Sequence, residues 1–287
     1  AMAMGTFLIP SMIEKGYDRP FALGVVGAAG TMGVLIPPSL AMILYGLIVE
    51  ESVPRLFLAG VVPGLIQACL LSAWIIYAAR RKGYEAGTRL SGNEFAKVNF
   101  RALPAFSIPI IVFIGIYGGY TTVAEAAGLA AILAAFIAVF IYRETPVSEI
   151  FEVITEGVKT ASGITFIVIF ALLFGHWITG SGVPTAIVEF AIAQDLQSWQ
   201  FLLFVNLLMI VLGMFLDAIA VILIVVPVVL PVLDALQIDK IHFGIVMVVN
   251  MEIAFLTPPI GLNLFVLSSI SRAPLTEAIK GVAPFIV

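Results

Sequence analysis

The chain carries the stretch Gly33-Val-Leu-Ile-Pro37-Pro38-Ser39 and, much later, the similar stretch Ala254-Phe-Leu-Thr-Pro258-Pro259-Ile260. Each stretch interrupts an apolar run that is otherwise long enough for a helix. Proline has no N–H to donate, and its ring displaces the carbonyl four residues earlier in a helix. The sequence therefore predicts two broken helices, one near each end of the chain.

Both stretches belong to one internal repeat with a constant offset of 221 residues, the separation of Pro37 from Pro258. The same offset aligns further identical or similar residues without a gap. These are Pro10 with Pro231, Asp18 with Asp239, Arg19 with Lys240, Gly60 with Gly281, Val61 with Val282 and Pro63 with Pro284. Self-similarity at a fixed offset indicates two structurally related halves.

The composition places the chain in a membrane. Apolar residues make up 61% and charged residues 11%, against about 25% charged in a typical soluble domain. The mean hydropathy is +1.14. A net charge of -4 without a basic stripe argues against a nucleic-acid partner. The single Cys69 excludes an internal disulfide. Because residue 1 already lies in an apolar segment without a charged leader, we expect a fragment that lacks its N-terminal part.

Apolar runs of about 20 residues predict the membrane crossings. We expect residues 1–13 to form the returning arm of a hairpin, 21–50 and 241–271 the broken helices, 54–79, 103–118, 121–142 and 160–180 full spans, 146–158 and 183–196 amphipathic interfacial segments, and 198–215 with 218–233 a re-entrant hairpin. Basic residues between positions 80 and 101 predict a cytoplasmic loop. Five crossings separate the repeat copies, and this odd number predicts that the copies are inverted. The expected fold is thus an all-α polytopic membrane protein with inverted repeats.

The Pro-Pro breaks free backbone carbonyls, which are costly in hydrocarbon unless something satisfies them. Sodium, a hard cation, suits a cage of such carbonyls and hydroxyls, completed by a hairpin tip at 213–218. The candidate cation-binding residues are Gly30, Gly33, Val34, Pro37, Gly213, Asp217, Ala254, Phe255, Thr257 and Pro258. A proline kink that only shapes packing is the alternative for an isolated break, but two tandem pairs in a repeat favour function.

A new half-helix is expected after each break, and its first N–H groups can bind an anion such as a carboxylate. The candidate substrate-binding residues are Ser39, Pro38, Pro259, Gly261 and Asn263. Simple helix capping is the competing explanation for Ser39 and for Asp217. Glu252, in the apolar run before the second break, is either functional or a buried carboxyl that hydrogen-bonds Asn250 or faces water.

These motifs resemble those of one family, the large membrane subunit of tripartite ATP-independent periplasmic (TRAP) transporters within the ion-transporter superfamily. The resemblance rests on Gly33-Val-Leu-Ile-Pro-Pro-Ser39, Phe57-Leu-Ala-Gly-Val-Val-Pro63, Gly115-Ile-Tyr-Gly-Gly-Tyr-Thr-Thr-Val-Ala-Glu-Ala-Ala127, Leu212-Gly-Met-Phe-Leu-Asp217, His242-Phe-Gly244 and Leu256-Thr-Pro-Pro-Ile-Gly-Leu-Asn-Leu-Phe-Val266. Two departures stand out. The family pattern Thr-Pro-Thr-Glu-Ala is here Thr122-Val-Ala-Glu125-Ala, which still predicts a capping box, and Ala254 stands where glycine is usual.

The resemblance implies a sodium-coupled symporter of the bacterial inner membrane that imports organic anions such as C4-dicarboxylates or sialic acid. It also implies two partners, a periplasmic substrate-binding protein and a small membrane subunit, with Na+ as coupling ion and no cofactor. In an elevator mechanism, residues 1–53 and 198–287 would form the moving transport domain. Residues 54–197 would form the scaffold and its arms.

Other functions stay open from the sequence. A stand-alone sodium/dicarboxylate symporter or a cation antiporter of the same superfamily is the nearest alternative. An enzyme is not expected, since the chain has no Gly-x-Ser-x-Gly and no His-Glu-x-x-His motif. His176 and His242 have no metal-ligating neighbour at suitable spacing and are expected to be packing or interfacial residues.

Overall fold

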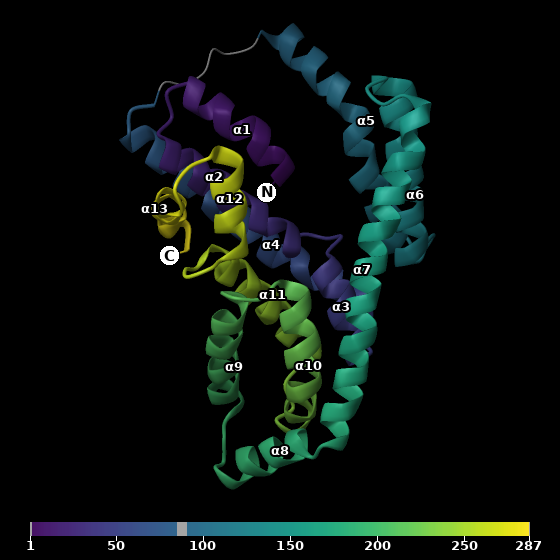
Figure 1. Cartoon of the computed structure of the whole chain (residues 1–287), viewed down its shortest axis with the longest axis vertical. Helices are drawn as coiled ribbons and strands as arrows, with labels where there is room; N and C mark the ends of the chain where they lie inside the picture. The colour runs from purple at the N-terminus through teal and green to yellow at the C-terminus, as the bar shows by residue number, and fades with distance from the viewer. Residues whose placement is uncertain (1, 85–90, 287) are drawn as a thin grey trace. The chain divides into compact units, whose positions relative to one another are not determined.

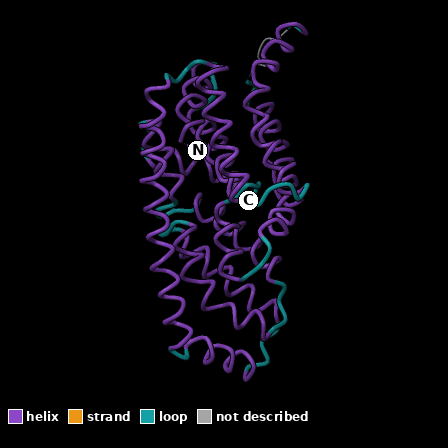
Figure 2. The backbone as a smooth tube through the Cα atoms, turned by 90° about the vertical axis from the view of Figure 1, so that its right-hand side faces the viewer, coloured by secondary structure: helices purple, strands orange, loops and turns teal. Residues whose placement is uncertain are grey.

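The computed structural model describes residues 2–84 and 91–286 of the chain (Figure 1). Within these ranges every regular element is a helix, and Figure 2 shows helix along almost the whole trace. The all-α architecture expected from the sequence is therefore confirmed. The chain divides into two compact units, residues 1–84 with 171–287 and residues 85–170.

The first unit contains both repeat copies. The first copy consists of α1 (Met2–Glu14), α2 (Arg19–Thr31), the short 3-10 helix η1 (Met32–Val34), α3 (Leu40–Val49) and α4 (Val53–Arg81). The second copy consists of α9 (Ser198–Gly213), α10 (Ala218–Ala235), α11 (Lys240–Leu256), α12 (Leu262–Ser271) and α13 (Leu275–Ile286). The two chain breaks between α2 and α3 and between α11 and α12 thus lie at the two Pro-Pro pairs. Both Pro-Pro peptide bonds are cis.

Helices of one repeat copy pack on helices of the other copy. The arm α1 packs on α12 of the other copy, and α10 packs on α3 in the same way. Likewise α2 packs on α13, and α11 packs on α4. Since the offset of 221 residues aligns each element of one pair with an element of the other, the contacts repeat with the copies interchanged. This arrangement is the one expected for a two-fold relation between the halves.

Glycine backbones allow α2 and α13 to approach very closely. A Cβ atom added at Gly24 would lie 2.0 Å from the carbonyl oxygen of Gly281, and one added at Gly281 would lie 2.1 Å from that of Pro20. The apolar core of the unit surrounds this contact. It is formed by buried residues of α1, α2, α11, α12 and α13, including Leu23, Leu264 and Val282.

The α9–α10 pair is the hairpin predicted at 198–215 and 218–233. The two helices stand side by side in Figure 1 and pack on each other and on α11. The side-chain amide of Asn250 in α11 donates to the side-chain oxygen Oδ1 of Asn206 in α9, which is a polar contact between two apolar helices. Half of α10 is buried inside the protein, against 6–22% in the other long apolar helices. This burial is expected for a hairpin arm enclosed by protein rather than by lipid.

Two further helices belong wholly or partly to this unit. The 34-residue α7 (Val147–Gly180) enters it at position 171, and α8 (Val183–Ala193) follows and packs on α10. The sequence suggested an interfacial segment at 146–158 followed by a separate span. Instead the helix is continuous, because residues 147–180 contain no proline to interrupt it.

The second unit holds α5 (Gly92–Tyr117), α6 (Val123–Phe136), the π-helical turn η2 (Ile137–Tyr142) and the first part of α7. Thr122 and Glu125 form the predicted capping box at the start of α6: the Thr122 backbone N–H donates to the Glu125 carboxylate at 2.8 Å, and the Glu125 N–H donates to the Thr122 hydroxyl at 3.3 Å. An equivalent box of Ser91 and Glu94 starts α5.

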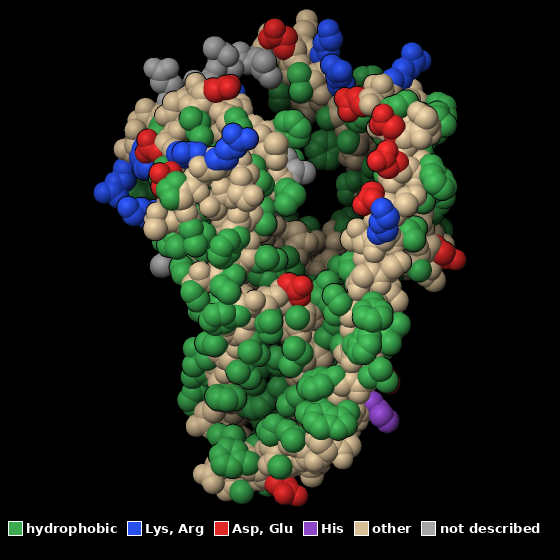
Figure 3. All heavy atoms as spheres, in the orientation of Figure 1, with side chains coloured by type: hydrophobic (Ala, Val, Ile, Leu, Met, Phe, Trp, Pro, Cys, Tyr) green, Lys and Arg blue, Asp and Glu red, His purple; other side chains and the backbone are tan. Residues whose placement is uncertain are grey.

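The chain is a multi-pass membrane protein by length and apolar character. Five of the described helical segments are long and apolar enough to cross a membrane, namely Val53–Arg81, Gly92–Tyr117, Val123–Tyr142, Val147–Gly180 and Ala218–Ala235. Hydrophobic side chains cover the surface around α9 and α10, whereas Lys and Arg side chains of the first unit gather near α2 and α13 (Figure 3). The first compact unit includes residues 54–84 and 171–197, which we assigned to a scaffold; which parts move stays a prediction.

We expect Gly281→Ala to lower the stability of the protein, because the new methyl group would collide with the Pro20 carbonyl and separate α2 from α13. Overpacking of this kind costs roughly 1–3 kcal/mol. The midpoint of thermal unfolding in detergent measures the effect. Gly128→Ala is the matched control, since a Cβ there meets nothing within 4 Å and alanine suits a helix better than glycine. An equal midpoint for the two variants would contradict the close contact.

Candidate functional site

At the first break, the Ser39 side chain binds a backbone carbonyl that the two prolines free from its helical partner. Ser39 is the N-cap of α3, and its hydroxyl accepts from the Met42 N–H at 3.4 Å while donating to the carbonyl oxygen of Val34. This is one of the two carbonyls that the prolines free. Ser39 and Pro37 are buried, whereas Gly33 and Pro38 are exposed. The capping role considered for Ser39 is therefore present, and a role in substrate binding stays a prediction.

The second break gathers carbonyl oxygens around a glycine. Gly261 is buried and has a φ of 52°, a conformation that favours glycine. A Cβ atom placed there would lie 2.9 Å from the carbonyl oxygen of Thr257 and 3.0 Å from that of Phe255. Both oxygens therefore lie close to Gly261, and the Leu264 side chain, 2.9 Å from the same Cβ position, also packs there. The carbonyl oxygen of Phe255 is one of those that a proline four residues later frees from its helical partner.

Thr257 ends α11 at this break. Its N–H donates to the carbonyl oxygen of Ala254 at 3.1 Å, and its hydroxyl donates to that of Ile253 at 2.7 Å. The hydroxyl oxygen keeps lone pairs for a further partner. Pro258 and Pro259 are exposed, so the chain between α11 and α12 is accessible.

The tip of the α9–α10 hairpin lies directly on the second break. The Gly261 N–H donates to the carbonyl oxygen of Met214 at 3.0 Å. A Cβ added at Gly213 would lie 2.7 Å from the Cβ of Ala254 and 3.3 Å from the Met251 side chain. The structure thus brings together the hairpin tip and the break, as the sequence suggested.

Asp217 starts α10 at the same tip. Its carboxylate accepts from the Ala220 N–H at 2.7 Å, and the residue is exposed. The capping role that competed with cation binding is therefore present. Its position beside the break leaves the binding role as a prediction.

The two half-helices begin differently. A serine hydroxyl caps α3, but no side chain caps α12, whose N-cap is Gly261. Asn263, in the first turn of α12, reaches across to the first copy and donates from its amide to the carbonyl oxygen of Gly27 at 3.5 Å. An uncapped helix start favours an anion, so the start of α12 is the more open of the two candidate sites.

The candidate residues of the first copy lie close together in the chain. The candidate residues Gly30, Gly33, Val34 and Pro37 lie along one short segment at the end of α2 and after it. Residues 2–84 and 91–286 contain no group of three His, Cys, Asp or Glu side chains that could hold a metal.

Of the roles weighed for Glu252, the hydrogen bond to Asn250 is wrong. The Gln67 amide of α4 donates to the carboxylate of Glu252, while Asn250 bonds Asn206 instead. Glu252 is only 2% exposed, and its second carboxylate oxygen has no hydrogen-bond partner among the described residues. A polar glutamine in an otherwise apolar span was the available signal for Gln67.

We expect Gly213→Ala to push the hairpin tip away from α11 and lower the thermal unfolding midpoint. The double variant Gly213→Ala/Ala254→Gly moves the methyl group from one side of the contact to the other and should recover most of the loss. The single variant Ala254→Gly serves as its reference. If the double variant were less stable than the two single changes together predict, the direct contact would be refuted.

The sequence matches the family model of the tripartite ATP-independent periplasmic transporter, DctM component, over residues 1–287. The C4-dicarboxylate TRAP transporter large permease protein DctM of Pseudomonas aeruginosa is 41% identical over 285 residues, which are 99% of this chain and 67% of that protein. The isethionate TRAP transporter permease protein DctMQ of Oleidesulfovibrio alaskensis is 36% identical over 285 residues, 99% of this chain and 45% of that protein.

The sialic acid TRAP transporter large permease protein SiaM of Vibrio cholerae is 31% identical over 287 residues, 100% of this chain and 67% of that protein. The chain therefore spans about two thirds of two of these relatives and less than half of the third. The match extends over both Pro-Pro breaks, the hairpin between them and the second unit. The chain belongs to the DctM family of TRAP transporter large permeases, a family of transporter subunits rather than enzymes.

Proposed function

We propose that the chain forms part of the large permease of a sodium-coupled importer of small organic anions. The observation that carries this proposal is the second break, where the carbonyl oxygens of Phe255 and Thr257 lie close to Gly261 beside an accessible helix start that no side chain caps. Relatives are named for C4-dicarboxylates, isethionate and sialic acid. All of these are small organic anions, and one general binding chemistry would serve them.

The carbonyl oxygens of Phe255 and Thr257 would bind the sodium ion, with the Thr257 hydroxyl as a further ligand. Carbonyl and hydroxyl oxygens suit a hard monovalent cation, and satisfying them by an ion removes the cost of leaving them unpaired in the membrane. The hairpin tip at Gly213 and Met214 would close the site from the other side. By the repeat, the Val34 and Ile36 carbonyls, which align with those of Phe255 and Thr257, would form the corresponding site.

The substrate anion would bind at the start of α12. The helix dipole places partial positive charge there, and no side chain neutralises it. The Asn263 amide could orient a carboxylate or hydroxyl of the substrate. A sodium ion between the same helix ends would favour binding of the anion, because opposite charges attract strongly where water is excluded. Cation and substrate would therefore bind together.

The same proposal includes the rest of the transporter. A periplasmic binding protein would deliver the substrate, and a small membrane subunit would join the permease in the bacterial inner membrane. The first unit, whose two repeat copies pack on each other, would move relative to a scaffold in an elevator mechanism. The burial of α10 inside protein supports a hairpin that moves together with α11.

Uptake into proteoliposomes tests the coupling. The complete permease with its small subunit should take up one of succinate, isethionate or N-acetylneuraminate when an inward sodium gradient and the binding protein are both present. Uptake without the binding protein would instead indicate a stand-alone symporter. Uptake driven by protons alone would contradict the sodium sites.

Thr257→Val tests the cation ligand. We expect the sodium concentration that gives half-maximal uptake to rise about tenfold, which corresponds to roughly 1.4 kcal/mol of binding. Thr179→Val is the matched control, since its hydroxyl donates to the carbonyl four residues earlier at 2.8 Å, as that of Thr257 does. The same rise in both variants would assign the Thr257 effect to helix packing.

A further inference from the structure

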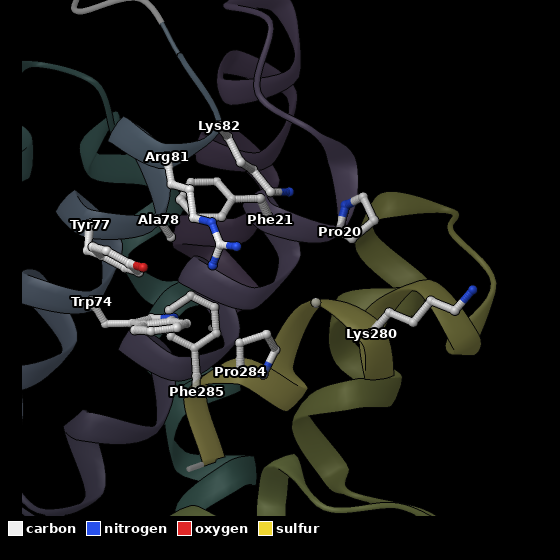
Figure 4. Close-up of a pocket in the computed structure, with 11 residues that line it drawn as sticks. Pro20, Phe21, Trp74, Tyr77, Ala78, Arg81, Lys82, Lys280, Pro284 and Phe285 are labelled. Carbon is white, nitrogen blue, oxygen red and sulfur yellow. The ribbon is translucent and has the colours of Figure 1, made fainter.

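A pocket of about 360 Å³ opens at the end of α4, between this helix, α2 and α13 (Figure 4). All its lining residues lie in the first unit, away from both Pro-Pro breaks. Its volume is near the lower end of the range of ligand pockets, roughly 300–1,000 Å³. The proposed transport function gives this pocket no role.

Aromatic side chains form much of its wall. Phe21 comes from α2, Trp74 and Tyr77 from α4, and Phe285 from α13. Gly281 also lines the pocket, at the place where the backbones of α2 and α13 meet. The lining residues thus lie on α2, α4 and α13, and close backbone packing fixes α2 relative to α13. This rigidity favours a pre-formed site.

The charged residues that line the pocket are all basic. They are Arg81, Lys82 and Lys280, and within residues 2–84 and 91–286 no acidic residue lines the pocket. The Lys82 ammonium is 2.7 Å from the carboxylate of Asp18, and this hydrogen bond lowers the pKa of Asp18. Arg81 and Lys280 form no ion pair among the described residues, so their charges stay available to a ligand.

Figure 4 shows how these side chains lie. Arg81 extends from α4 into the space among the labelled aromatic rings, while Lys280 extends outward from α13. An anion at the mouth of the pocket could contact the guanidinium of Arg81, and Lys280 could bend toward it. The rings would contact the apolar part of the same ligand.

The pocket also lies at the depth of a lipid headgroup. α4 is a candidate span whose last residues include Arg80 and Arg81, followed by Lys82. Charged side chains are expensive in hydrocarbon, so this end of α4 lies at the membrane surface. Tryptophan and tyrosine are enriched at that level, and basic pockets between membrane helices bind anionic headgroups.

We propose that this pocket binds the headgroup of an anionic phospholipid, with Arg81 and Lys280 at the phosphate and the aromatic wall along the start of the acyl chains. A lipid fits better than a free phosphate, because a small soluble anion would contact only the basic groups and leave the apolar wall of Phe21, Trp74, Tyr77 and Phe285 unoccupied. The proposal is independent of substrate and coupling ion. It adds a lipid-binding site to a membrane surface of the first unit.

Quenching of Trp74 fluorescence by brominated lipids tests this site. The chain contains three tryptophans, so Trp177→Phe/Trp199→Phe leaves Trp74 as the reporter, and Trp74→Phe in the same background gives the residual signal. The protein, with any subunit that co-purifies, is reconstituted in phosphatidylcholine vesicles. These contain either brominated phosphatidylglycerol or brominated phosphatidylcholine at the same mole fraction.

We expect stronger quenching by phosphatidylglycerol. Arg81→Gln should lower the apparent affinity for this lipid roughly fivefold more than Arg80→Gln does, because it also removes the charge-assisted hydrogen bonds between the guanidinium and the phosphate. Arg80→Gln is the matched control, because it removes the same charge from the same helix and does not line the pocket. Lys280→Gln provides a second reading on a different helix if Arg81→Gln is poorly folded.

Several results would overturn the proposal. Equal quenching by both lipids, or an equal loss in Arg80→Gln and Arg81→Gln, would show only a general attraction to the surface. Relief of the phosphatidylglycerol effect by inorganic phosphate would identify a soluble anion as the ligand. Absence of quenching by either lipid would show that protein covers Trp74.

Discussion

The need to satisfy backbone carbonyls inside a membrane governs this structure. A Pro-Pro pair removes two intrahelical hydrogen bonds, and hydrocarbon offers no replacement donor. The chain contains this break twice and places other polar groups beside each. At the first break a serine hydroxyl binds the Val34 carbonyl. At the second, the Gly261 N–H donates to the Met214 carbonyl of the hairpin tip, and the Phe255 and Thr257 carbonyl oxygens lie close to Gly261.

This difference makes the two repeat copies unequal in chemistry although similar in fold. Ser39 supplies both a donor and an acceptor, so the start of α3 is capped by the chain itself. Gly261 supplies no side chain, so no side chain caps the start of α12. The two N-caps are also not equivalent positions of the repeat, because the offset aligns Ser39 with Ile260 and Gly261 with Leu40.

Much of the fold followed from local patterns in the sequence. The constant offset, the Pro-Pro pairs and the apolar runs predicted the broken helices, and Thr122 with Glu125 predicted a capping box that is present. These features depend on neighbours in the chain. The continuity of α7 was missed because an amphipathic segment and an apolar one can share a helix when no proline separates them.

The candidate site was predictable only in part, for a related reason. Gly213 and Ala254 could be placed together from the hairpin motif, but the contact of Met214 with Gly261 involves backbone atoms that carry no side-chain signal. The pairing of Gln67 with Glu252 joins α4 to α11 and needs the tertiary arrangement. The choice between helix capping and ligand binding for Ser39 and Asp217 depends on where their side-chain oxygens point, and the sequence alone does not give this direction.

The exchange of partners between the repeat copies has a consequence for biogenesis. α2 lies near the beginning of the chain, yet its close glycine contact is with α13 near the end. Contacts of such long sequence separation form late, after a large entropic cost of loop closure. During synthesis α2 therefore enters the membrane before α13, the helix that packs on it, has been made.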